Sequence, residues 1–274
     1  MPVLALGSWN RPQRRHLSES LSERLASLSV TNPVDALADA LISLQSLTGL
    51  PWYATIVIST VVLRSVTTLP LALVQRKRLG RLMGIAPIIK AWEETLKHQA
   101  TRDVKRNQAW RTAEQGARSL QKQYQAKLTE LYRIHNCHPL KTFLVPWVQL
   151  PLFVSMSFAL RKLTAFPLPW MDTPPQPAPG IVEGGLGWFV DLSAADPTMI
   201  FPVFIGLCHL TTIQLNTSKL PLSGRAKVMR AIFRGLAIVS IPIAANVPMA
   251  VVLYWATSGV FSLVQIAIFR YLKL

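Results

Sequence analysis

The chain is short of acidic residues and of cysteine. It holds 13 Asp and Glu against 29 Lys and Arg in 274 residues, which gives a formal net charge of +16. Two cysteines, Cys137 and Cys208, exclude a scaffold built on several disulfides. The sequence has no Walker phosphate loop, no glycine-rich dinucleotide turn and no nucleophile elbow, so none of these motifs supports an enzyme or a bound cofactor.

One short run carries metal-capable side chains. His135, Cys137 and His138 lie within four positions, but their spacing matches no zinc signature and no second ligand pair accompanies them. We therefore expect a loop that approaches a helix start rather than a metal site.

Apolar residues make up 50% of the chain and gather in long runs. A bilayer is crossed by about 20 such residues in a helix. Five runs are candidates for spans: about 50–74, 142–160, 198–216, 231–247 and 248–269. They predict an all-α polytopic membrane protein with one domain over residues 31–274. Residues 1–30, with arginines at 11, 14 and 15, fit the remnant of a targeting segment.

Lys and Arg alternate between rich and poor segments along these runs. Residues 76–141 carry fifteen Lys and Arg against five Asp and Glu, and residues 217–234 carry five and none. Residues 1–49 are neutral, and 161–197 are net negative. The positive-inside rule then predicts five spans with the N-terminus outside and the C-terminus inside.

Two further helical features are predicted outside the spans. Asn32 can cap a helix that has Pro33 at its first position and ends near Gly49, which predicts an amphipathic helix on the outer surface. Residues 76–141 are polar and helical in composition, which predicts an inner-side hairpin that turns near 101–107 or Gly116. The fourth span is short, since thirteen residues separate Arg234 from Pro248.

The outer connection before the third span has a different composition. Residues 165–187 are rich in proline and glycine, which predicts an irregular loop.

Arg64 lies near the middle of the first apolar run. An arginine at membrane depth costs at least ~2.5–3.5 kcal/mol and marks a functional cavity in most membrane proteins. No predicted span contains Asp or Glu, so we expect water in a groove to solvate this guanidinium. The alternative is a helix whose arginine reaches an interface by snorkelling.

Four strings resemble, in order, the YidC/Oxa/Alb family of membrane-protein insertases. They are the arginine-bearing span continuing into Leu69-Pro70-Leu71, His138-Pro139-Leu140 with Val148-Gln149-Leu150-Pro151, Trp188-Phe189-Val190 to Asp196-Pro197, and Ala245-Asn246-Val247-Pro248 through Tyr254-Trp255 and Ser258. The family usually has Asn-Pro-Leu where this chain has His-Pro-Leu. The similarity covers about residues 33–271.

The resemblance implies a groove that is open to the inner side and to lipid and closed outward, with no nucleotide hydrolysis and no enzyme activity. A client's polar tail would enter the groove while its apolar segment moves into lipid. Arg64 matches the family arginine, and the other groove residues expected from resemblance and polarity are Thr60, Gln149, Gln214, Tyr254, Trp255 and Gln265. For each single polar residue, packing between helices or anchoring at the interface remains open.

The Asn136-Cys137-His138-Pro139 string resembles the mitochondrial cytochrome c oxidase assembly branch of the family. That branch exports the C-terminal domain of oxidase subunit 2, which implies newly made membrane proteins and assembly factors as partners in the mitochondrial inner membrane. The bacterial plasma membrane is the alternative. The last span is followed by four or five residues, without the long basic tail of ribosome-tethered members, so we expect no ribosome tethering.

Other classes of function stay open. An anion transporter could use Arg64, although no repeated pair of broken helices is evident. In a non-catalytic assembly scaffold Arg64 would be dispensable. Nucleic-acid binding as the main function has little support, because no aromatic stacking residues are interleaved with the basic segments.

The charge pattern makes a prediction about topology. In mitoplasts, added protease should cut the Pro-rich loop at 165–187 and spare the basic hairpin at 76–141, because the hairpin lies on the matrix side. Cleavage of the hairpin from the outer side would rule out the five-span topology.

Overall fold

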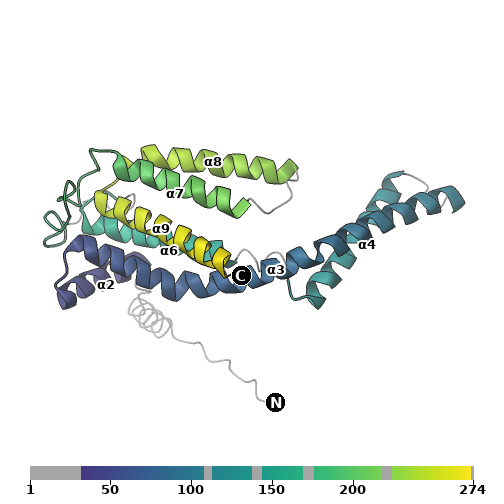
Figure 1. The fold of residues 1–274 in the computed structure, drawn as a ribbon, viewed down its shortest axis with the longest axis horizontal. Helices are drawn as coiled ribbons and strands as arrows, with labels where there is room; N and C mark the ends of the chain where they lie inside the picture. The colour runs from purple at the N-terminus through teal and green to yellow at the C-terminus, as the bar shows by residue number, and fades with distance from the viewer. Residues whose placement is uncertain (1–31, 108–112, 138–143, 169–175, 218–223, 273–274) are drawn as a thin grey trace, which may run out of the picture.

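The computed structural model describes residues 32–107, 113–137, 144–168, 176–217 and 224–272. These residues form seven helices and no strand: α2 (Pro33–Thr48), α3 (Trp52–Asn107), α4 (Ala113–Ile134), α6 (Leu144–Leu163), α7 (Ile200–Thr217), α8 (Gly224–Ala244) and α9 (Met249–Tyr271) (Figure 1). The all-α fold predicted from the sequence is confirmed for this part of the chain. The targeting remnant proposed for residues 1–30 lies outside the described residues.

The signals at both ends of α2 act as the sequence predicts. The Asn32 side chain accepts a hydrogen bond from the Val34 amide at 3.2 Å, and Pro33 occupies the first turn. Gly49 ends the helix at φ +64°, where its amide donates to the Gln45 carbonyl at 2.8 Å. Glycine adopts this left-handed conformation without a steric penalty, so the chain can turn directly into α3.

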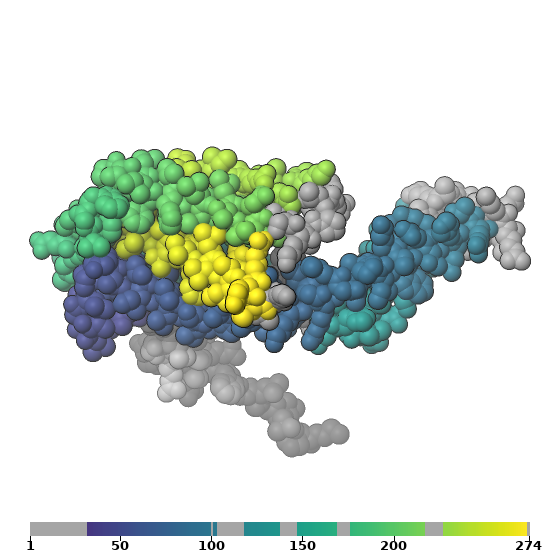
Figure 2. Space-filling model, viewed as in Figure 1, coloured from purple at the N-terminus to yellow at the C-terminus, as the bar shows by residue number. Residues whose placement is uncertain are grey.

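The first span and the first arm of the hairpin are one continuous helix. At 56 residues, α3 is ~84 Å long at 1.5 Å per residue. The basic run at residues 75–78 does not interrupt it, because Gln, Lys and Arg are good helix formers. The second arm is α4, and the two arms project from the bundle (Figure 2). The predicted turn positions, 101–107 and Gly116, are both helical, and the residues that connect the two arms lie outside the described residues.

The other helices gather around α9. This helix packs on α3, α6 and α7, while α8 packs on α7 and α2 packs on α3 and α6 (Figure 1). Two helical segments are long and apolar enough to cross a membrane, Trp52–Gln99 of α3 and Met249–Tyr271 of α9, and the apolar Ile200–Asn216 of α7 is shorter. The count of five spans therefore stays a prediction.

The helix α8 extends beyond the fourth predicted span. The apolar run predicts a span at 231–247, and α8 is a 21-residue helix that starts at Gly224. The turns before this run carry Lys227 and Arg230, and Arg234 lies within the run. The helix is ~31 Å long, but its apolar part after Arg234 is shorter than a span requires, so this span stays a prediction.

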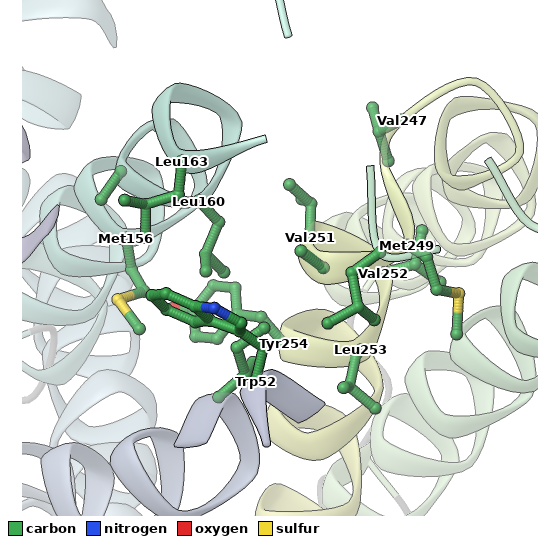
Figure 3. Close-up of a cluster of buried hydrophobic side chains, with 14 of the residues drawn as sticks. Trp52, Met156, Leu160, Leu163, Val247, Met249, Val251, Val252, Leu253 and Tyr254 are labelled. Atoms are coloured by element: carbon green, nitrogen blue, oxygen red, sulfur yellow. The ribbon is translucent and has the colours of Figure 1, made fainter. Parts of the chain in front are cut away.

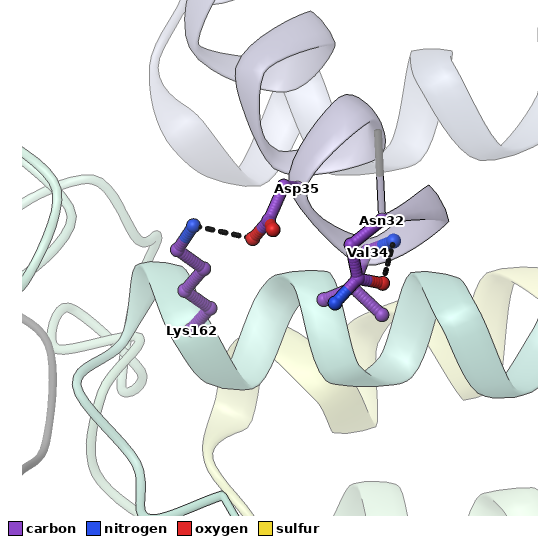
Figure 4. A network of polar contacts seen from close by, with 4 residues as sticks. All are labelled: Asn32, Val34, Asp35 and Lys162. Atoms are coloured by element: carbon purple, nitrogen blue, oxygen red, sulfur yellow. Dashed lines mark hydrogen bonds and ion pairs between the residues drawn. The ribbon is translucent and has the colours of Figure 1, made fainter. Parts of the chain in front are cut away.

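The apolar core lies where α2, α3, α6 and α9 meet. Trp52 of α3, Met156 of α6 and Tyr254 of α9 converge there, each at most 3% exposed (Figure 3). On the outside of this core, Lys162 of α6 forms an ion pair with Asp35 of α2 at 2.6 Å (Figure 4). This pair is partly exposed and adds at most about 1 kcal/mol, so apolar packing holds α2 in place.

The loop before α7 satisfies the free amides at the starts of two helices. The Tyr53 amide donates to the Gly184 carbonyl at 2.8 Å, and the Met249 amide to the Ala194 carbonyl at 2.7 Å. The Trp52 indole donates to the Pro179 carbonyl at 2.9 Å. The described part of the loop is irregular, as predicted, but it fixes the N-terminal ends of α3 and α9.

Asp196 holds the start of α7 in the same way. Its carboxylate accepts hydrogen bonds from the Thr198 amide and hydroxyl at 3.0 and 2.6 Å, and from the Phe201 amide at 3.0 Å. Burial alone would raise the pKa of Asp196, but these hydrogen bonds outweigh burial and lower the pKa below its usual value. The residue therefore stays ionised and caps α7.

Close packing of the loop on α3 predicts that Gly184→Ala destabilises the protein. An added Cβ would lie 2.6 Å from the Trp52 Cβ and 2.8 Å from the Gly180 carbonyl oxygen. We expect a loss of roughly 1–3 kcal/mol, seen as a lower thermal midpoint in detergent. Gly80→Ala in α3 is the matched control, since its Cβ meets nothing within 4 Å. Equal midpoints for both variants would contradict this packing.

Candidate functional site

Arg64 lies on α3 and is 7% exposed. Its Nε donates to the Ser258 hydroxyl at 3.0 Å, and its Nη1 donates to the Ser262 hydroxyl at 2.9 Å. The guanidinium carbon is 5.8 Å from the centre of the Phe261 ring. A buried arginine is therefore held by hydroxyl groups and one aromatic face, all from α9.

The sequence places these two serines on one face of α9. Ser258 and Ser262 are four residues apart, so their side chains lie one helical turn from each other. The Ser262 hydroxyl donates to the Ser258 carbonyl at 3.0 Å, which leaves its lone pairs for Arg64. At Gly259 an added Cβ would come within 3.1 Å of the Cys208 Cβ, so the glycine allows α7 and α9 to approach closely.

This arrangement differs from the expectation that water alone would solvate Arg64. Hydroxyls from a neighbouring helix supply part of the solvation. A guanidinium has five N–H donors, and three of those on Arg64 have no acceptor in the described part of the chain. Neither serine was predicted as a site residue, although their spacing of four on an apolar helix is a signal that sequence reasoning could have used.

A cavity of about 300 Å³ opens beside the guanidinium. Four helices line it, and α9 contributes the most residues. The lining consists of Arg64 from α3, Gln149, Leu150 and Phe153 from α6, His209 and Thr212 from α7, and Trp255, Ser258, Gly259 and Ser262 from α9. Since α6 and α7 both pack on α9, this helix forms the wall between them.

Three of the residues predicted for the groove line this cavity together: Arg64, Gln149 and Trp255. The Trp255 indole donates to the Ser157 hydroxyl at 3.0 Å and stacks on Phe153, with ring centroids 5.7 Å apart. These contacts fix the orientation of the indole against α6.

The other four predicted residues are not among those that line the cavity. Thr60 is fully buried, and its hydroxyl donates to the Ile56 carbonyl of its own helix at 2.6 Å. Tyr254 belongs to the apolar core, with its ring centroid 5.3 Å from that of Phe153. Gln214 is exposed and accepts a hydrogen bond from Arg234 at 2.7 Å. Gln265 is half-buried on α9 and is not among the lining residues.

Sequence reasoning missed His209 and Thr212. They lie three residues apart on α7, so they share the face that lines the cavity. His209 is the one histidine inside a predicted span, and this was an available signal. A polar residue in an apolar helix usually faces the bundle interior or a cavity.

Arginines gather beyond the cavity, near the end of α9. Arg270 donates to the Leu215 carbonyl at the end of α7, and Arg76 lies over the Phe269 ring at 5.2 Å. Burial and then the charge of Arg270 lower the pKa of Arg76. A positive field therefore lies between the cavity and the basic hairpin.

The run with metal-capable side chains, which begins at His135, follows directly after α4, the second arm of the hairpin. Cys137 is fully buried and packs in a small apolar cluster with Ile85 and Leu131. Burial raises the pKa of its thiol, which keeps it protonated and weakens it as a metal ligand. In the described ranges no three His, Cys, Asp or Glu side chains gather as a metal site would require, and His138 lies outside those ranges.

Comparison with known proteins gives a match over most of the chain. The profile of the 60Kd inner membrane protein family matches residues 43–273. The human cytochrome c oxidase assembly protein COX18, mitochondrial, is 33% identical over 244 residues, covering 89% of this chain and 72% of that protein. Its Schizosaccharomyces pombe counterpart cox18 is 30% identical over 231 residues, covering 81% and 96%. The mitochondrial inner membrane protein oxa1-2 of the same yeast is 31% identical over 254 residues, covering 91% and 55%.

The contacts of Arg64 generate a prediction for stability. Replacing Ser258 and Ser262 together by Ala should lower the thermal midpoint in detergent, because two donors of a buried cation lose their acceptors. The expected loss is about 1–3 kcal/mol. Adding Arg64→Met to this double variant should restore most of the midpoint, since the charge that needs the hydroxyls is gone.

Ser65→Ala is the control for the serine substitutions, because Ser65 is exposed on α3. It should leave the midpoint unchanged. If Arg64→Met fails to rescue the double variant, the serines stabilise the protein by a route other than the guanidinium.

Proposed function

The chain belongs to the 60Kd inner membrane protein family, the YidC/Oxa/Alb insertases, and from this premise we propose that it inserts membrane proteins and exports their polar tails through the cavity at Arg64. The observation that carries the proposal is one buried arginine, with donors left over in the described part of the chain, that lines a cavity with several polar side chains between apolar helices. Such a cavity lowers the cost of bringing a polar or anionic segment to membrane depth.

The protein is located in the mitochondrial inner membrane; the relative oxa1-2 is named as a protein of that membrane, and COX18 as a mitochondrial protein. The basic hairpin and the arginines near the end of α9 then lie on the matrix side in our proposal. The five helical segments α3, α6, α7, α8 and α9 would cross the membrane with the N-terminus outside and the C-terminus inside. Positive charge at the matrix end would attract acidic tails toward the cavity.

The path into lipid follows from the way the helices pack. Because α6 rests on α2, α3 and α9 while α7 rests on α8 and α9, a client segment can leave the cavity between α6 and α7. The apolar part of a client gains free energy on entering lipid, about 25 cal/mol for each Å² of apolar surface removed from water. This gain supplies the driving force, so the protein needs no nucleotide and no covalent chemistry.

The names of the relatives support a client from cytochrome c oxidase. Two of them are named cytochrome c oxidase assembly proteins, which supports the C-terminal domain of oxidase subunit 2 as the exported segment. Other newly made membrane proteins and assembly factors are further partners in this proposal. A non-catalytic assembly scaffold is the second candidate, because the relatives are named for assembly. It is placed second because a scaffold would leave the cavity unused. An anion transporter gains no support from the relatives.

A charge-selective effect is expected from substitutions at Arg64. Arg64→Ala should reduce export of a subunit 2 tail rich in Asp and Glu by about tenfold, the size of one charge-assisted hydrogen bond, and should reduce export of a neutralised tail less. Arg64→Lys should retain part of the activity because the charge remains while the forked donor geometry is lost. Export is measured as protease sensitivity of the tail in intact mitoplasts.

Steady-state abundance of the protein is the control. Snorkelling or a purely structural role would lower abundance of the Arg64→Ala protein and would affect both tails alike. Normal abundance combined with normal export of acidic tails would rule out the proposed role of the cavity.

A further inference from the structure

His209 is the one titratable side chain besides Arg64 among the residues that line the cavity. It lies on α7, opposite the residues that α6 contributes, and it is half-buried. The hydrogen bonds around it suggest what the ring contributes.

The hydrogen-bond chain behind His209 fixes which ring nitrogen carries the proton. The Ser240 hydroxyl of α8 donates to the Ala237 carbonyl at 2.7 Å, which is the usual length of an O–H···O bond. A hydroxyl has one proton, so Ser240 can only accept from His209, whose Nδ1 lies 3.3 Å from its oxygen. On this ground we assign the proton to Nδ1, and Nε2 of the neutral ring is then an acceptor.

The cavity then presents donors and an acceptor. Within the described ranges, three N–H groups of Arg64 have no acceptor and the imidazole Nε2 of His209 has no donor. An unfolded tail brings one carbonyl and one N–H with each residue. At membrane depth each such group left unpaired costs several kcal/mol, whatever the side chain beside it.

We propose that Arg64 and His209 together form a binding site for a peptide group, in which Arg64 donates to a backbone carbonyl of the client tail and Nε2 of His209 accepts from a backbone N–H. The proposal rests on the proposed function and specifies what the same cavity recognises. Arg64 alone favours acidic side chains. The pair adds recognition of the backbone, which every tail shares.

Two substitutions separate this role from a structural one. Gln places its amide where Nε2 of histidine lies, so His209→Gln keeps an acceptor toward the cavity and loses the bond to Ser240. Asn places its amide where Nδ1 lies, so His209→Asn keeps the bond to Ser240 and loses the acceptor. Export of the subunit 2 tail is measured in mitoplasts, with the native acidic tail and with a tail neutralised by Asn and Gln.

His209→Asn should reduce export of both tails by the same factor, roughly five- to tenfold, because a backbone contact is lost. His209→Gln should stay within about twofold of the unsubstituted protein. Yields are normalised to the abundance of each variant, and photocrosslinking of the tail to Gln149, at the cavity wall, measures capture per molecule where a variant accumulates poorly.

The proposal would be overturned if His209→Gln impaired export and His209→Asn exported normally. That result would mean that His209 holds α7 against α8. A loss with Asn that is confined to the acidic tail would also overturn it, because the effect would then act through the charge of Arg64. Arg64→Ala is run in parallel. If it leaves export of both tails normal, the proposed function fails; if it impairs export while His209→Asn does not, only the peptide-group site fails.

Discussion

One unpaired cation at membrane depth is the constraint on which the rest of the site depends. No acid occurs in the predicted spans, so the charge of Arg64 has to be solvated by dipoles. The structure meets part of this need with two serine hydroxyls and the face of Phe261. Full neutralisation by a carboxylate would close the site to an anionic client, whereas hydroxyls hold the guanidinium in place and leave its charge in the cavity.

The fold supports this arrangement by fixing α9 against three neighbours. Carbonyls of the loop before α7 accept from amides at the starts of α3 and α9, and the apolar core around Trp52 fixes the relative position of the two helices. The small residue Gly259 lets α7 approach α9, which brings His209 and Thr212 to the cavity wall. The polar residues therefore lie in a cavity whose walls are held rigidly by apolar packing far from the charge.

Sequence reasoning predicts those features that local chemistry determines. The cap at Asn32, the turn at Gly49 and the helical segments follow from residue preferences, and Arg64 stands out because a cation is costly in an apolar run. The sequence did not predict where α8 begins or that α3 continues into the hairpin. Both were inferred from changes of polarity, which mark a membrane border, whereas the helices continue across that border. The spacing of Ser258 and Ser262 and the single histidine of a predicted span were available signals, but which helices bring these residues to one cavity depends on how α3, α7 and α9 pack. Thr60 and Tyr254, polar by type, lie in packed surroundings and are not among the lining residues.

The central claim is that a client's polar tail occupies the cavity beside Arg64, and site-specific photocrosslinking tests it most directly. A photoreactive residue is placed at Thr212, on the cavity wall, and in a separate variant at Val66, which is 71% exposed on α3. During synthesis of oxidase subunit 2, the account predicts crosslinks from position 212 to the polar tail of the client and none to that tail from position 66. Equal crosslinking from both positions, or none from position 212 while export proceeds, would contradict the account.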